Sequence, residues 1–268
     1  KILCAHSAKA KDSMRTAAIL VVAASAASAA LFNPTVRLDS GKSATLLGRG
    51  PPVVFSSGLF GTSTWRMYST LLGLLQGNVT IAAVPGPVAA GDVQELADAI
   101  GVDRVGFLSH SAFDPDILSS PCVTRAVVCD PIALPLLRSP RAACPTLVVR
   151  AGLLFDDERL PEFNRMRVEG EHVSEAVYDD VGHTDLLDDW WAEIAARSGI
   201  WRTTRGRRTA TFRSWTKSDR MRDAARARRR EHREELAARI SEFLLPLALE
   251  EAAPLSAAGG APDDVEPT

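Results

Sequence analysis

Three side chains of the types that together cleave esters occur in this chain in the order serine, aspartate, histidine. Ser111 follows the apolar run Val105–Leu108, Asp130 ends another apolar run, and His183 lies in a loop after a third. A serine hydroxyl is a poor nucleophile at neutral pH unless a histidine removes its proton. The histidine in turn needs a carboxylate that holds its tautomer. The sequence therefore predicts nucleophilic catalysis, with Ser111 as the nucleophile and His183 as the base.

Ser111 is expected on a nucleophile elbow, a tight strand-to-helix turn that exposes a serine hydroxyl above the end of a sheet. The usual pattern is Gly-x-Ser-x-Gly, because the backbones of the strand and the helix approach closely at the glycines. Here the outer positions are Ser109 and Phe113, and only the first of them is small. Taken alone, this stretch is also typical of an ordinary turn. His110 is expected to point away from Ser111 and to be structural.

The elements around these residues alternate between buried strands and amphipathic helices. Such alternation predicts a parallel sheet that is covered on both faces, with ligands at the carboxyl ends of the strands. After Ser111 the chain leaves room for little more than one helical turn before the next strand. The expected elements are a hairpin within 36–47, strands at 53–56, 79–84, 105–108, 124–129, 145–150 and 173–178, and helices at 65–75, 92–100 and 219–249.

The acid that orients His183 has more than one candidate at this edge of the sheet. Asp130 ends the strand after the one that carries Ser111, whereas Asp156 and Asp157 follow the next strand along the chain. Spacing alone does not choose between them. An oxyanion hole also needs two preorganised backbone N–H groups. The expected donors are Ala112, directly after the nucleophile, and Leu59, in the glycine-flanked loop after the first buried strand.

Four segments together resemble chlorophyllase and chlorophyllase-like esterases, especially the algal kind. These segments are Gly58-Leu-Phe-Gly-Thr62, Ser109-His-Ser111, Val128-Cys-Asp-Pro131 and Gly182-His-Thr-Asp-Leu-Leu-Asp-Asp189. The last segment is the most specific, whereas Ser-His-Ser is common to many hydrolases. The resemblance covers roughly residues 36–190 and resumes in the helical stretch 233–243.

The resemblance implies an α/β-hydrolase fold, with Ser111, Asp130 and His183 as the catalytic triad. It therefore favours Asp130 over Asp156 as the acid. It also implies hydrolysis of the phytyl ester of chlorophyll to chlorophyllide and phytol, without a cofactor. Two departures from the family pattern are the missing glycine at Phe113 and the shortened helix after the elbow. Two other functions stay open: a different carboxylesterase or lipase, and a catalytically inactive hydrolase-fold protein that binds a lipid or pigment.

The N-terminal stretch has the composition of a targeting leader rather than of a folded element. Lys9, Lys11 and Arg15 precede a short apolar run, and Ala27-Ser28-Ala29 has the small-x-small form of a cleavage site. We expect residues 1–32 to be a secretory-type leader. The junction after it favours a plastid destination, with secretion as the alternative.

The remaining organisation follows from charge and composition. The chain has 268 residues and a net charge of −2, and residues 33–250 are expected to form the hydrolase domain. Residues 201–233 carry thirteen Arg or Lys against three acids. This basic insertion is expected to be a solvated charged segment, with contact to an anionic membrane as the alternative and nucleic-acid binding not expected. Residues 251–268 are expected to be a disordered tail. The four cysteines show no metal spacing and are expected to be free thiols, most of them buried.

Overall fold

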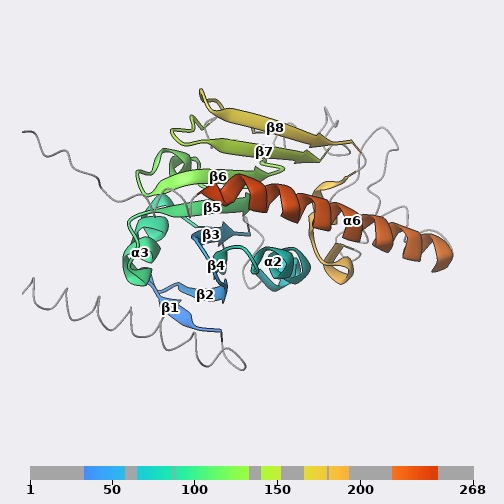
Figure 1. Cartoon of the computed structure of the whole chain (residues 1–268), viewed down its shortest axis with the longest axis horizontal. Coiled ribbons are helices and arrows are strands. Elements are labelled where there is room, and N and C mark those ends of the chain that lie inside the picture. The colour runs from blue at the N-terminus through green and yellow to red at the C-terminus, as the bar shows by residue number, and fades with distance from the viewer. Residues whose placement is uncertain are drawn as a thin grey trace, which may run out of the picture.

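The computed structural model describes residues 33–57, 65–86, 88–132, 140–151, 166–179, 181–192 and 219–246. These residues form an eight-stranded sheet in the order β1-β2-β4-β3-β5-β6-β7-β8 (Figure 1). All neighbouring pairs from β4 through β3 to β8 are parallel, whereas β2 pairs antiparallel with β1 and β4. The strands are β1 (Thr35–Arg37), β2 (Ser43–Gly48), β3 (Pro52–Ser56), β4 (Thr80–Val84), β5 (Val105–His110), β6 (Val123–Cys129), β7 (Thr146–Ala151) and β8 (Val173–Tyr178).

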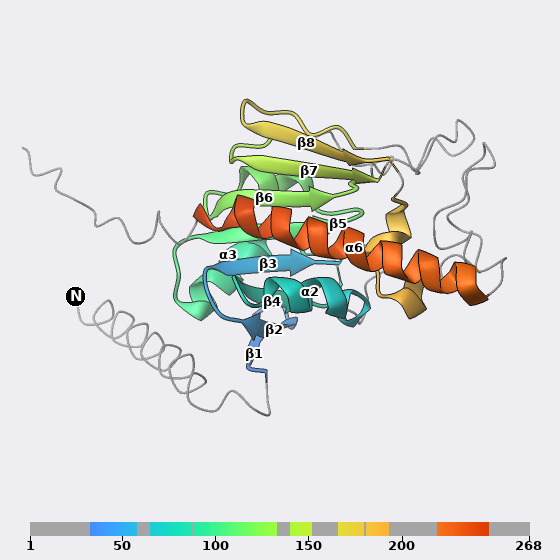
Figure 2. The same ribbon diagram turned by 45° about the vertical axis from the view of Figure 1, so that its right-hand side comes forward.

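The helices cover both faces of the sheet, as the alternating pattern predicts. On one face lie α2 (Ser69–Leu75), which follows the 3-10 turn η1 (Trp65–Tyr68), and α6 (Asp219–Leu244). On the other face lie α3 (Ala90–Ile100) and the 3-10 turn η2 (Pro115–Ser119) (Figure 1, Figure 2). The expected end of α3 is confirmed, because Gly101 has φ +76° and donates its backbone N–H back to the last turn.

The crossing from β5 to β6 is short and replaces a full helix with η2. Phe113 is buried on the α3 face, with its ring centroid 5.9 Å from that of Phe107. Asp114 accepts hydrogen bonds from the backbone N–H of Asp116 at 3.1 Å and of Ala90 at 3.0 Å, so it joins η2 to the start of α3. The departure from Gly-x-Ser-x-Gly at Phe113 is accommodated, because the short turn η2 and not a full helix follows it.

α6 begins beyond the carboxyl ends of the strands and runs back across the sheet (Figure 2). Leu236, Ile240 and Leu244 of α6 are buried in the core. The expectation of a solvated basic stretch is wrong at Arg229 and Arg233, which are 0% and 3% exposed. Both arginines are buried because they bind the loop after β8, as described below.

The remaining predictions concern the cysteines, membrane-spanning helices and the terminal and basic segments. Cys122, Cys129 and Cys144 are buried free thiols, as predicted. Among the described helices, none is long and apolar enough to cross a membrane. The expected leader at 1–32, the basic stretch 201–218 and the tail at 251–268 lie outside the described residues.

Replacing Phe113 by alanine is expected to lower the free energy of unfolding by about 3–4 kcal/mol, because the change leaves a cavity against Phe107. Phe113→Leu, which keeps most of the volume, should cost less than about 1.5 kcal/mol. Urea unfolding of the three proteins measures the difference. A gain in stability for Phe113→Gly would contradict this role and would restore the view that a small residue is required there.

Candidate active site

Ser111 lies directly after β5, at the carboxyl edge of the parallel sheet. Its backbone φ is +70°, a left-handed conformation that costs a residue other than glycine about 1–2 kcal/mol. Its N–H donates to the carbonyl of Cys129 at 2.9 Å, so the turn is tied to the end of the neighbouring strand β6. Ser111 therefore lies on a strained turn at the end of β5, and its position on a nucleophile elbow stays a prediction.

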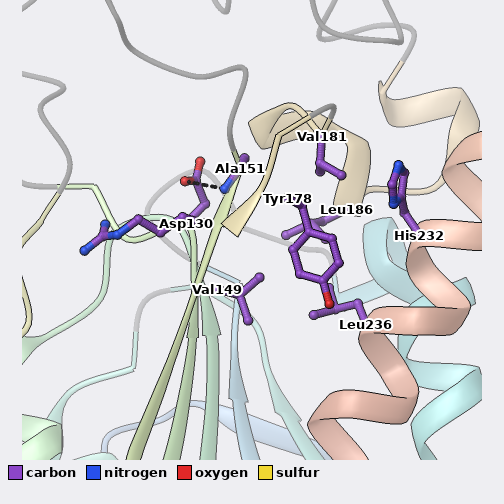
Figure 3. Close-up of a pocket in the computed structure, with 9 residues that line it drawn as sticks. Asp130, Val149, Ala151, Tyr178, Val181, Leu186, His232 and Leu236 are labelled. Carbon is purple, nitrogen blue, oxygen red and sulfur yellow. Dashed lines mark hydrogen bonds between the residues drawn. The ribbon is translucent and has the colours of Figure 1, made fainter. Parts of the chain in front are cut away.

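Asp130 and His183 form a buried hydrogen-bonded pair at the same edge. The Nδ1 atom of His183 lies 2.7 Å from Oδ2 of Asp130, and the two residues are 3% and 1% exposed. The other carboxylate oxygen accepts the backbone N–H of Ala151 at 3.1 Å (Figure 3). Asp130 also has a positive φ of +42°. Its two oxygens therefore hold fixed partners, and one of these partners is the imidazole that a triad acid has to orient.

The other predicted site residues have different outcomes. Leu59 and the alternative acid Asp156 lie outside the described residues. Ala112 is buried directly after Ser111, and its role as an oxyanion donor stays a prediction. His110, which directly precedes Ser111, contacts His183, with ring centroids 4.3 Å apart and ring planes tilted by 33°.

His110 was expected to be structural and to point away from Ser111, and its ring contacts that of His183, the candidate base. Its Nδ1 atom lies 2.7 Å from the hydroxyl of Tyr68, which is buried at the end of η1. Burial lowers the pKa of His110 well below its ordinary value, and the neighbouring His183 lowers it further. β5 continues two residues beyond the strand expected at 105–108, so His110 is a strand residue that shares a face with Leu108 by the alternation along a strand.

Three aspartates fix the loop that carries His183. Asp185 accepts the backbone N–H of Gly182 at 2.8 Å, which closes the turn η4 (His183–Leu186) around the histidine. Asp188 accepts the N–H of Thr70 at 2.9 Å and hydrogen-bonds Ser69, both in the first turn of α2, where a carboxylate is favourable. The loop is thereby attached to the helix layer of the α2 face.

Asp189 attaches the same loop to α6. One carboxylate oxygen accepts from Nε of Arg229 at 2.9 Å and from Nη2 of Arg233 at 3.1 Å. Arg233 also donates to the carbonyl of Leu187 at 2.8 Å. Burial by itself would raise the pKa of Asp189, but the hydrogen bonds and charges of the two arginines lower it below its ordinary value.

A pocket lies behind Asp130, between β7, β8 and α6 (Figure 3). Tyr178 from β8 faces His232 from α6, with ring centroids 6.2 Å apart. The lining of the pocket combines apolar side chains with those of Asp130, Arg150, Tyr178 and His232. Its lining residues are Asp130, Val149, Arg150, Ala151, Tyr178, Val181, Leu186, His232 and Leu236. The described residues contain no group of three or more His, Cys, Asp or Glu placed to hold a metal ion.

The strand order, with an antiparallel β2 at one side, places a serine after β5, an aspartate after β6 and a histidine after β8. This order and pairing are the topology of the α/β-hydrolase fold. No model of a known protein family matches the chain, and no curated protein does.

Several solved α/β-hydrolase-fold structures are similar to this chain. An alpha/beta hydrolase from Sphaerobacter thermophilus has 22% identity and a TM-score of 0.30 over 38% of this chain and 46% of its own. Epoxide hydrolase VrEH1 from Vigna radiata has 18% identity and a TM-score of 0.31 over 40% and 41%. An epoxide hydrolase from hot-environment metagenomes has 14% identity and a TM-score of 0.42 over 63% and 97%. The chain thus spans less than half the length of the first two, and the likeness concerns the fold alone.

The strained backbone at Ser111 predicts a difference in stability between two variants that both lack the hydroxyl. Ser111→Gly should be about 0.5–1 kcal/mol more stable than Ser111→Ala, because glycine accepts φ +70° without a Cβ penalty. Chemical denaturation of both variants measures the difference. Equal stabilities, or a more stable alanine variant, would show that Ser111 is not strained.

The attachment of the histidine loop to α6 should depend on pH. Asp189→Asn should cost about 2 kcal/mol at pH 7, less than for a fully buried pair because the Asp189 side chain is 31% exposed. The pKa of Asp189 is lower in the folded protein, so its stabilisation is present at neutral pH and is lost as the pH falls below about 4. Urea unfolding at neutral pH and in acid should therefore show that the free energies of unfolding of the wild-type and Asp189→Asn proteins converge in acid. Asp103→Asn, at an exposed position, is the control, and a gap that persists in acid would contradict the assignment.

Proposed function

We propose that this protein is a serine carboxylic-ester hydrolase. The observation that carries the proposal is the buried 2.7 Å contact between Asp130 and His183. The His183 ring also contacts the ring of His110, the residue directly before the strained Ser111. A carboxylate that holds Nδ1 leaves Nε2 as the atom that can accept a proton. A serine, rather than a carboxylate, after β5 supports acyl transfer through an ester intermediate.

In the proposed reaction Ser111 Oγ attacks the ester carbonyl carbon while His183 Nε2 takes the hydroxyl proton. The negative charge moves to the carbonyl oxygen, which the amides of Ala112 and Leu59 are proposed to bind. The C–O bond to the alcohol then breaks, and His183 gives the proton to the departing alkoxide. Water repeats the sequence on the acyl-serine and releases the acid. Asp130 stays ionised throughout and stabilises the imidazolium of His183.

For the substrate we propose the phytyl ester of chlorophyll, so that the products are chlorophyllide and phytol. The support is the resemblance to chlorophyllase-like esterases, whose most specific segment is Gly182–Asp189. The reaction as proposed uses no cofactor. A plastid destination and contact with an anionic membrane through the basic stretch 201–233, apart from the buried Arg229 and Arg233, belong to the same proposal.

Substitution of the triad separates the proposed chemistry from binding alone. In the full-length protein, Ser111→Ala and Asp130→Asn should each lower kcat about 10⁴-fold, because the first removes the nucleophile and the second favours the wrong histidine tautomer. The readouts are chlorophyllide formed from chlorophyll and alcohol released from a short acyl ester. Asp116→Asn, at an exposed position in η2, is the matched control and should keep wild-type turnover.

The two readouts distinguish the general proposal of a serine esterase from the specific proposal of chlorophyll as its substrate. Turnover of both substrates that depends on Ser111 supports a chlorophyllase-like enzyme. Turnover of only the short ester keeps the triad and removes chlorophyll as the substrate, which leaves another carboxylesterase or lipase. Absence of turnover of both substrates by a folded protein contradicts the proposal that this protein is an esterase.

A second candidate function is a catalytically inactive hydrolase-fold protein that binds a lipid or pigment. The observation that favours it is the short crossing at η2, which lacks the helix whose N-terminus faces an oxyanion in a full elbow. A fluorophosphonate probe decides between the two functions, because it labels only an activated serine. Chlorophyll binding without labelling of Ser111 would favour the inactive protein.

A further inference from the structure

The candidate base is held by contacts from two directions. Asp130 lies 2.7 Å from Nδ1 of the His183 ring, and the ring of His110 lies against that ring, with centroids 4.3 Å apart and planes tilted by 33°. His110 is itself 4% exposed and is held at Nδ1 by the Tyr68 hydroxyl at 2.7 Å. The ring of Phe55 in turn contacts Tyr68 edge-on, with centroids 5.1 Å apart. The sheet thus supports the imidazole through a short chain of aromatic contacts.

A hydrogen bond and a ring contact constrain different degrees of freedom. The covalent bond at Cγ and the contact at Nδ1 hold two adjacent atoms of the His183 ring, and the ring plane can still tilt about the line that joins them as χ1 and χ2 adjust. A flat neighbour against the ring face removes this rotation. The orientation matters because Nε2 must face the serine hydroxyl, and a misplacement of about 1 Å can cost on the order of 10²-fold in rate.

We propose that His110 is a positioning residue for catalysis, which sets the plane of the His183 ring so that Nε2 faces Ser111. This proposal rests on the proposed function, because it assigns His183 the role of base. His110 acts through its flat shape and does not itself transfer a proton to the substrate.

A neutral His110 suits this role. The titratable groups that face it are Tyr68 from η1 and His183 from η4. Burial raises the pKa of Tyr68 above its ordinary value, so its hydroxyl stays protonated. Burial and the neighbouring His183 lower the pKa of His110 well below its ordinary value, although a hydrogen bond with the His183 backbone acts in the other direction. An uncharged neighbour does not oppose the imidazolium that forms on His183 during acyl transfer.

The test compares two variants of similar bulk, of which only one keeps a flat ring. His110→Phe should retain most of kcat, whereas His110→Leu should lower kcat at least about 10-fold with little change in KM. A readout independent of turnover is the NMR resonance of the His183 Nδ1 proton, assigned by its loss in His183→Gln. This resonance should stay sharp with phenylalanine and broaden with leucine, because a mobile ring exchanges its proton with water.

Leu108→Ala is the control for lost stability, because Leu108 is buried two residues earlier on the same strand. It should destabilise the protein and keep both the resonance and kcat. The proposal is overturned if phenylalanine and leucine at position 110 behave alike, or if Leu108→Ala reproduces the effect of leucine. If the wild-type protein hydrolyses no ester, the proposed function fails, and the resonance still decides whether His110 positions the ring.

Discussion

The structure depends on one buried hydrogen bond between residues 53 positions apart, Asp130 and His183. The bond needs both partners at one edge of the sheet, and different elements deliver them. Asp130 is tied through its N–H to Val149 and through its carboxylate to Ala151, so β7 fixes the acid. The histidine arrives on a loop that has no strand of its own. Its placement therefore depends on side-chain contacts to α2 and α6, which makes those helices part of the site.

The most specific sequence segment, Gly182–Asp189, is chiefly a device for holding one histidine. Asp185 closes its own turn, Asp188 binds the start of α2, and Asp189 binds two arginines of α6. Each of these three carboxylates has a backbone, hydroxyl or guanidinium partner. Their charges are therefore explained by structural contacts, and no catalytic role has to be assigned to them. The resemblance carried by this segment thus concerns the scaffold that holds His183, and substrate choice has to be tested separately.

Much of the fold was predictable from the sequence because the strands are short apolar runs that end in small or polar residues. The hairpin, the helix that ends at Gly101 and the parallel strands follow from local rules that tertiary structure did not override. The roles of Arg229 and Arg233 were not predictable, because a buried arginine is recognised only through its distant partner Asp189. The contact of His110 was missed for a similar reason: whether a residue beside an elbow faces the base depends on the loop that returns from β8.

The departure from Gly-x-Ser-x-Gly has a physical explanation in the short crossing. Glycine is required at the second outer position when a helix leaves the turn and packs closely on the strand. Here η2 replaces that helix, so space remains for Phe113, which fills the face next to Phe107. Ser111 keeps its positive φ because Cys129 holds its N–H on one side and the buried Phe113 anchors the chain two residues later. The sheet and this anchor therefore impose the elbow geometry without the helix, and Phe113 is a consequence of the short crossing rather than an argument against the serine.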